Sequence, residues 1–195
     1  MQRVIHPIEV ESYRILRERV DTAHLSPLTR AVTERIVHTT ADPSWVGELI
    51  TTEQALAQGR AALLAGAPLL ADVRMVAAAV TARECTVCLD LAGPIEGLTR
   101  SAAGIRAAAA RFPDGAVWAI GNAPTALAEL LRLAEDGEVR PALVIGLPVG
   151  FVGSVAAKSA LRASGLNALS NASERGGAAI AGAAINALLY AEGDA

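Results

Sequence analysis

Two cationic side chains, His38 and Arg35, lie three residues apart in the segment 34–42. Residues at this spacing project from the same face of a helix. A histidine can give up a proton near neutral pH, and an arginine can bind a carboxylate with two parallel hydrogen bonds. The pattern therefore suits acid catalysis beside a bound carboxylate. From the residues alone, a structural histidine is the commoner alternative, and an ion pair of Arg35 with Glu34 or Asp42 is an equal alternative.

The helix that carries both side chains is predicted to begin at Pro27, with Ser26 as its N-cap, and to end near His38. A histidine at a helix C-terminus is stabilised in its imidazolium form by the macrodipole. Asp42 follows closely enough in the sequence to support that form as well. The predicted helix therefore places a proton donor at its end.

Around this helix, the sequence alternates between helical patterns and short apolar runs. Such alternation predicts an α/β fold with three layers, in which a mostly parallel central sheet has helices on both faces. The length fits one domain, residues 1–195. The predicted strands are residues 69–73, 86–91, 117–121 and 142–147. The other predicted helices are residues 9–19, 51–66 (opening on a Thr51–Gln54 capping box), 99–112, 123–135, 155–164 and a last one after Gly177.

Composition excludes several classes of function. A net charge of −3 and 3% aromatic residues argue against nucleic-acid binding, which needs basic surfaces and stacking rings. The longest apolar stretch, residues 178–191, is shorter than the roughly 20 residues that span a bilayer, so no membrane partner is expected. Two cysteines and the lack of a signal peptide indicate the cytoplasm.

The two cysteines, Cys85 and Cys88, form a C-x-x-C pattern. On the predicted strand, positions three apart point to opposite faces. A zinc site would also need further ligands, and the sequence has no second cysteine pair. We therefore expect neither a metal nor a redox site, although a turn at this position would reopen the question.

Several segments, in order along the chain, carry a family resemblance. They are HPIEVES (6–12), ERIVHTTAD (34–42), DVRMV (72–76), GNAPTAL (121–127), GLPVGFVG (146–153) and residues 175–188. Together they resemble the precorrin-8X methylmutase family. The resemblance implies a parallel α/β fold and a homodimer with sites near the subunit interface. It implies transfer of a methyl group from C-11 to C-12 of a reduced tetrapyrrole with many carboxylates, giving hydrogenobyrinic acid. No dissociable cofactor is implied, and any cobalt would belong to the substrate.

By this resemblance His38 is the catalytic acid, and a set of residues from the matching segments contacts the substrate. Ser12 is expected to hydrogen-bond an acetate side chain, and the 146–153 run to form a backbone wall along the tetrapyrrole plane. Lys158 is a carboxylate partner in this interpretation, with a surface lysine as the alternative. The expected substrate-binding residues are Ser12, Arg35, Asn122, Thr125, Gly146, Gly150, Lys158, Arg175 and Gly176.

The turn 121–125 also suits an anion from its residue types, because it leads into a predicted helix N-terminus. A carboxylate-rich substrate would use that site. The alternative is a plain strand-to-helix connection with Asn122 as its cap, and both can hold together.

Two other functions stay open. One is a tetrapyrrole carrier that kept the fold without catalysis, which Glu174 favours, because it stands where the family has a cation; Ala178 likewise replaces a hydroxyl of the family pattern. A pure carrier would not need an acid at His38. The other is an unrelated nucleotide-binding α/β protein, but the run 146–153 lacks the G-x-G-x-x-G order and no phosphate loop follows an early strand.

Overall fold

The computed structural model describes residues 6–191, which are built around a six-stranded sheet of order β1-β6-β5-β4-β2-β3. Each neighbouring pair from β6 to β3 is parallel, and β1 joins the edge antiparallel to β6. The prediction of a mostly parallel sheet is confirmed. The strands are β1 (Leu49–Thr51), β2 (Leu69–Ala71), β3 (Thr86–Val87), β4 (Val117–Ile120), β5 (Leu143–Gly146) and β6 (Ala168–Asn171).

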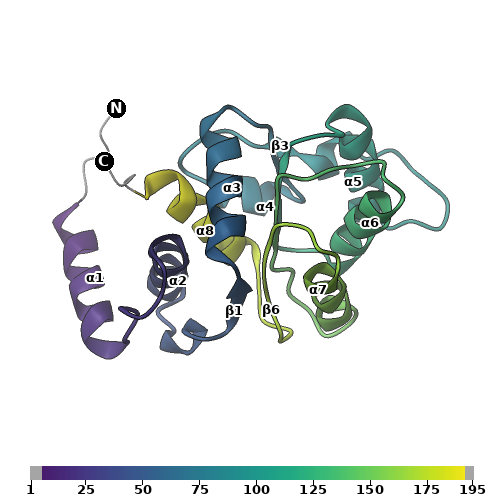
Figure 1. Ribbon diagram of the computed structural model, residues 1–195. Coiled ribbons are helices and arrows are strands. Elements are labelled where there is room, and N and C mark those ends of the chain that lie inside the picture. Colours follow the sequence, from purple (N-terminus) through teal and green to yellow (C-terminus); the bar gives the residue numbers. More distant parts are fainter. Residues whose placement is uncertain (1–5, 192–195) are drawn as a thin grey trace.

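Helices cover both faces of this sheet (Figure 1). On one face lie α3, α4 and α8, with α2 packed outside α8 and α1 packed outside α2. On the other face lie α5, α6 and α7. The predicted three-layer α/β class is therefore confirmed. The helices are α1 (Pro7–Arg19), α2 (Pro27–Thr40), α3 (Glu53–Leu64), α4 (Arg74–Ala79), α5 (Arg100–Arg111), α6 (Pro124–Glu135), α7 (Ser154–Ala163) and α8 (Ala178–Tyr190), with the 3₁₀ turns η1 (Pro43–Trp45) and η2 (Cys88–Leu91).

Strand β4 shows why the apolar runs are continuous. Val117 and Ala119 belong to the core shared with α2, α3 and α8, whereas Trp118 and Ile120 belong to the core shared with α5, α6 and α7. All four side chains are fully buried. A central parallel strand that is covered on both faces must be apolar at every position.

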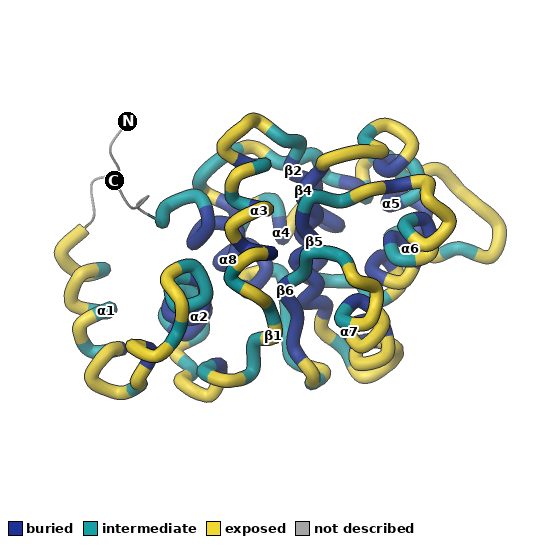
Figure 2. The backbone as a smooth tube through the Cα atoms, in the orientation of Figure 1, coloured by how far each residue is buried: buried dark blue, intermediate teal, exposed yellow. Residues whose placement is uncertain are grey.

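Helix α1 is packed far less deeply than the rest, and most of it is exposed or only half-buried (Figure 2). Its one buried side chain is Leu16. Ile8 and Val10 are 74% and 57% exposed. Because apolar burial contributes about 25 cal/mol per Å², this helix gains little from the core, and its polar contacts with α2 matter correspondingly more.

The sequence missed three elements, which are β1, β6 and α4. Strand β6 contains Ser170 and Asn171, both fully buried, and their polarity hid the strand. Ser170 is satisfied there because its hydroxyl donates to the Gly146 carbonyl at 3.0 Å. Residues 88–91 were expected to continue a strand but form η2 instead.

The predicted cap of α3 is wrong, and Ser26 holds the predicted N-cap position of α2 without a side-chain bond. Thr51 lies in β1, where its hydroxyl donates to the Ala168 carbonyl, and Thr52 caps α3 by accepting from the Ala55 amide. At α2, the Ser26 side chain makes no capping bond. The carboxylate of Glu53 accepts from the amides of residues 28 and 29 at 2.7 and 2.9 Å, so a distant acid satisfies this helix start.

The cysteine pair does not lie on one strand, because Cys88 opens η2. Both thiols are free. Burial raises the pKa of Cys85 to about 11 and that of Cys88 to about 12, so neither is a reactive thiolate at neutral pH. Within residues 6–191, no three acidic, histidine or cysteine side chains are grouped to hold a metal ion. In the same range, no helix has the length and apolarity needed to cross a bilayer.

Candidate active site

His38 lies in the last turn of α2, as predicted, and is half-buried beneath α1. The residue that follows the helix, Ala41, adopts the left-handed conformation with φ 51°. Glycine usually occupies such a position, because a side chain there costs about 1 kcal/mol. The imidazole Nδ1 lies 2.8 Å from the Ser12 hydroxyl, so the two residues that the sequence separates by 26 positions are in direct contact.

Helix α1 holds the imidazole from two directions. The Ser12 hydroxyl can either donate to Nδ1 or accept from it, so it suits both the neutral and the protonated ring. The Tyr13 ring stacks on the imidazole, with centroids 4.9 Å apart and planes inclined by 11°. The ring is therefore fixed both at one nitrogen and on one face.

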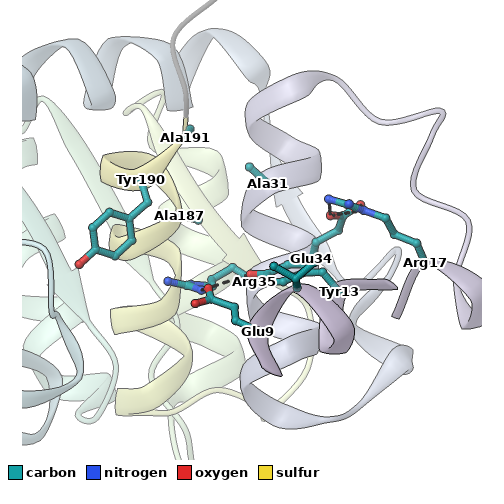
Figure 3. A pocket seen from close by; sticks show the side chains of 10 residues that line it. Glu9, Tyr13, Arg17, Ala31, Glu34, Arg35, Ala187, Tyr190 and Ala191 are labelled. Atoms are coloured by element: carbon teal, nitrogen blue, oxygen red, sulfur yellow. Dashed lines mark hydrogen bonds and ion pairs between the residues drawn. The ribbon is translucent and has the colours of Figure 1, made fainter. Parts of the chain in front are cut away.

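Arg35 lies one turn before His38 and pairs with neither Glu34 nor Asp42. Its Nη1 donates to Glu9 at 2.7 Å and to the Tyr13 hydroxyl at 3.3 Å (Figure 3). The Arg35 and Glu9 side chains are only 12% and 18% exposed. The Tyr190 ring lies 5.6 Å from the guanidinium carbon. Arg35 therefore already has a carboxylate partner, which any substrate carboxylate must join or displace.

Glu34 anchors α1 and its following loop to α2. The carboxylate is 3% exposed and accepts from Arg17, Arg30 and the buried Thr22 hydroxyl, at 2.7–2.8 Å for the shortest bonds. Burial alone would raise the pKa of Glu34, but these hydrogen bonds outweigh it and lower the pKa. This carboxylate thus serves the structure rather than the chemistry of His38.

Two cavities flank the contact between Tyr13 and His38. One, of about 120 Å³, is lined by Ser12, Arg19 and His38 together with apolar residues of α1, α2 and the segments that follow them. The other, of about 390 Å³, lies between α1, α2 and α8 and is lined by Tyr13, Arg35 and Tyr190 among others (Figure 3). The predicted acid and the predicted carboxylate-binding arginine thus face neighbouring cavities.

Asp42 is engaged away from His38, which corrects its expected role. One carboxylate oxygen accepts from the Ser44 amide and hydroxyl, and the other accepts from Arg175. These bonds from Ser44, and then the charge of Arg175, lower the pKa of Asp42. The Arg175 guanidinium also lies 4.3 Å from the Trp45 ring centre. Arg175 therefore joins the end of α2 to the loop 172–177.

Lys158 is fully buried, so the alternative of a surface lysine is wrong. Its ammonium donates to the carbonyls of Ser173 at 2.9 Å and of Arg175 at 2.5 Å. Burial, followed by the charge of Arg162, lowers the pKa of Lys158 to about 8, although Glu174 opposes the shift. The structure places this cation beneath the loop 172–177, where it bonds the backbone rather than facing a cavity described above.

The predicted anion site at the start of α6 contains an anion from the protein itself. The carboxylate of Asp72, 1% exposed, accepts from the amides of Asn122 and Ala123 at 2.9 and 3.0 Å, and from those of Gly121 and Val73. Burial raises the pKa of Asp72, while these four donors oppose the rise. Asn122 is not the cap, since Ala123 holds that position without a side-chain bond.

Two of the predicted glycines, Gly146 and Gly176, allow close packing. A Cβ on Gly146 would lie 2.3 Å from Leu161, and one on Gly176 would lie 2.2 Å from the Leu147 carbonyl oxygen. Gly150 donates its amide to the Glu174 carbonyl at 3.2 Å. Thr125 is exposed, and its hydroxyl lies 2.8 Å from that of Thr99. The loops after β5 and β6 thus lie against each other, backbone to backbone.

The structure therefore brings Ser12, Arg35 and His38 together and places the other predicted residues in separate groups. Sequence reasoning missed Glu9 and Tyr13, which contact Arg35 and His38 directly. Both lie in or beside the first matching segment, so that segment was the only signal for them. Nothing in their types distinguishes them from ordinary residues of a solvated helix.

Known proteins resemble the chain over nearly its whole length. Residues 7–191 match the model of the precorrin-8X methylmutase family. A precorrin-8X methylmutase of Pseudomonas aeruginosa is 36% identical, covering 91% of each chain. A cobalt-precorrin-8 methylmutase of Methanocaldococcus jannaschii is 34% identical, covering 84% of this chain and 80% of that protein.

A solved structure extends the likeness to the fold. The precorrin-8X methylmutase of Thermus thermophilus superposes with a TM-score of 0.85 at 34% identity, covering 94% of this chain and 96% of that one. The family match and the solved structure agree with the mostly parallel α/β fold. The chain belongs to the precorrin-8X methylmutase family, a family of isomerases in cobalamin biosynthesis.

Proposed function

We propose that this chain moves the methyl group of precorrin-8X from C-11 to C-12, with His38 as the acid. The imidazolium gives a proton to the conjugated macrocycle, which makes the ring system cationic. The methyl group then migrates with its bonding electrons to the neighbouring carbon. The proton returns to the imidazole afterwards, so the product, hydrogenobyrinic acid, is an isomer of the substrate.

The observation that carries this proposal is the way His38 is held. Its Nδ1 is bonded to Ser12, and its face is covered by Tyr13. The end of α2 favours the charged ring through the macrodipole. Because Nδ1 is the nitrogen that contacts Ser12, we assign the proton transfer to Nε2.

Arg35 supplies a carboxylate-binding group one turn away. It pairs with Glu9 in a largely buried position, and an arginine can donate to two carboxylate oxygens at once. A substrate carboxylate would therefore exchange with Glu9 or share the guanidinium with it. The family implies a tetrapyrrole with several carboxylates, which fits this cation. The reaction needs no dissociable cofactor, and cobalt would enter only as part of the substrate.

A homodimer is part of the proposal, and cavity size supports it. The cavity at His38 is about 120 Å³, whereas pockets for drug-sized ligands are about 300–1,000 Å³. A tetrapyrrole is larger than such ligands, so α1 must move or a second copy must complete the site. Sedimentation of the purified protein measures directly whether it is a dimer. The compartment we propose is the cytoplasm, which the two free thiols suit.

The test is anaerobic turnover of metal-free and cobalt-containing substrate, followed by the visible spectrum. We expect wild type to form the corrin chromophore and His38→Ala to bind without turnover. The matched control is His24→Ala, because this exposed histidine lies in the loop between α1 and α2. Binding without turnover by wild type would favour the carrier alternative, and absence of binding would exclude both.

A further inference from the structure

Tyr13 contacts both residues to which the proposed reaction assigns chemistry. Its ring stacks on His38, and its hydroxyl accepts from the Arg35 Nη1. Burial raises the pKa of Tyr13, so the hydroxyl stays neutral and able to hydrogen-bond throughout the physiological range. One side chain thus spans the distance between the acid and the carboxylate-binding cation.

The contact of Tyr13 with His38 restricts rotation of the imidazole ring. Rotation of an imidazole about its second side-chain torsion is broad, because that torsion joins an sp³ to an sp² carbon. The hydrogen bond with Ser12 restrains one nitrogen but does not by itself set the plane of the ring. A stacked ring inclined by 11° sets the plane as well, and the direction of Nε2 follows from the two restraints together.

The position of Tyr13 between two cavities gives this restraint a further consequence. The Tyr13 ring lines the cavity of about 390 Å³ that also contains Arg35, whereas His38 lines the cavity of about 120 Å³. Each member of the stacked pair therefore faces a different cavity. Any group that binds Arg35 from the larger cavity meets the hydroxyl and ring that hold His38.

We propose that Tyr13 is a positioning residue, which fixes the plane of the His38 ring by stacking and is itself held in place by Arg35. This inference rests on the proposed function, because it gives a partner to the acid named there. Positioning has a large effect on rate, since a misplacement of about 1 Å can cost about 100-fold. The stack should contribute most of this effect, and the hydroxyl less.

The experiment compares Tyr13→Leu, which removes the stack, with Tyr13→Phe, which keeps the ring and removes the bond to Arg35. We expect Tyr13→Leu to lower kcat by about 10- to 100-fold with little change in KM. Tyr13→Phe should restore kcat to within about threefold of wild type, because its ring still covers the imidazole. The matched control is Arg14→Gln. Arg14 follows Tyr13 on α1, its side chain is 55% exposed, and it forms ion pairs with Glu11 and Glu18.

A second readout needs no turnover. In wild type and Tyr13→Phe, the ring current of the stacked residue displaces the proton resonances of the His38 imidazole, and Tyr13→Leu should remove this displacement. If Tyr13→Leu does not fold, Tyr13→Met carries the same test with a flexible side chain. The proposal would be overturned if the variant without the ring had the kcat of wild type and the same His38 resonances as wild type.

The same assay separates this proposal from the one beneath it. Turnover by His38→Ala would remove the acid role and overturn the proposed mechanism. An inactive His38→Ala beside a fully active Tyr13→Leu would leave that mechanism intact and overturn only the positioning role of Tyr13. A loss of kcat in Tyr13→Phe as large as that in Tyr13→Leu would also overturn it, because the hydroxyl and not the stack would then carry the effect.

Discussion

Two regions that carry predicted site residues use their polar groups in opposite ways. Around the loops after β5 and β6, Lys158 of α7 and Arg175 bond carbonyls, a carboxylate and a hydroxyl of the protein itself. Between α1 and α2, Arg35 and His38 line or adjoin cavities beneath a thinly packed helix. A cation in a motif is therefore no proof of a ligand. In this protein the first region is a frame, and the second has the space and the proton donor that chemistry needs.

The largest loss of stability is expected from a substitution in the frame, at Gly176. A Cβ there would lie 2.2 Å from the Leu147 carbonyl oxygen and 2.7 Å from that of Pro148, and backbone atoms cannot rotate away. We expect Gly176→Ala to cost about 3 kcal/mol or more of unfolding free energy, as overpacking against a rigid neighbour does. Urea denaturation measures this loss of unfolding free energy.

The control for this substitution is Gly93→Ala. A Cβ on Gly93 meets nothing within 4 Å, and its backbone is not left-handed. We expect its unfolding free energy to stay within about 0.5 kcal/mol of wild type. Equal stability of the two variants would mean that the loops after β5 and β6 are not the rigid frame described above.

A smaller effect is expected when the loop 172–177 loses the cation beneath it. Lys158→Met keeps the volume but leaves the Ser173 carbonyl without its ammonium donor, whereas the Arg175 carbonyl keeps a bond from Asn171. We expect a loss of about 1–2 kcal/mol at pH 7, the typical cost of a buried acceptor without a partner. Denaturation with urea compares the variant with wild type.

The pH dependence of that difference tests the buried charge. The pKa of Lys158 is lowered from 10.5 to about 8 in the folded protein. Between these values the unfolded chain binds more protons, so stability rises with pH. The cost of the buried charge is fully present below pH 8 and is relieved towards pH 10.5. Wild type should therefore gain on the order of 1–2 kcal/mol over Lys158→Met from pH 8 to 10, and a difference that stays constant would contradict a buried ammonium.

The same two regions show how far the sequence could predict the structure. The apolar runs predicted β2, β4 and β5, because a strand buried on both faces must be apolar throughout. Strand β6 was missed because Ser170 and Asn171 are buried by hydrogen bonding rather than by apolarity. The local pattern of a helix or strand is visible in the chain, but a polar residue satisfied by a distant partner is not.

The candidate site follows the same division. The sequence predicted that Arg35 and His38 lie on one helix, and it predicted that His38 lies near the end of that helix. The residues that hydrogen-bond to His38 and Arg35 come from α1, between 22 and 26 residues away. No periodicity in the sequence predicts these contacts. Likewise, the helix start that was expected to bind a substrate anion is occupied by Asp72, 50 residues before Asn122.

The smallest effect is expected at the contact that joins the two regions, the ion pair of Asp42 and Arg175. The two side chains are 41% and 35% exposed, and such pairs contribute little because water and salt screen them. After Asp42→Asn, Arg175 keeps its bond to Ser44 at 2.9 Å and its place over Trp45. We expect an unfolding free energy indistinguishable from that of wild type, both in dilute buffer and in 1 M salt.

A double-mutant cycle of Asp42→Asn with Arg175→Gln sharpens this expectation. If the charges contribute nothing, the effects of the two single substitutions should add, and Arg175→Gln alone should destabilise the protein through the lost contact with Trp45. A coupling that clearly exceeds the error of the single variants, and that salt weakens, would contradict this. The ion pair would then connect the loop 172–177 to the end of α2, and substrate carboxylates near Arg175 would be able to weaken that connection. A connection made by stacking of Arg175 on the buried Trp45 ring is insensitive to them.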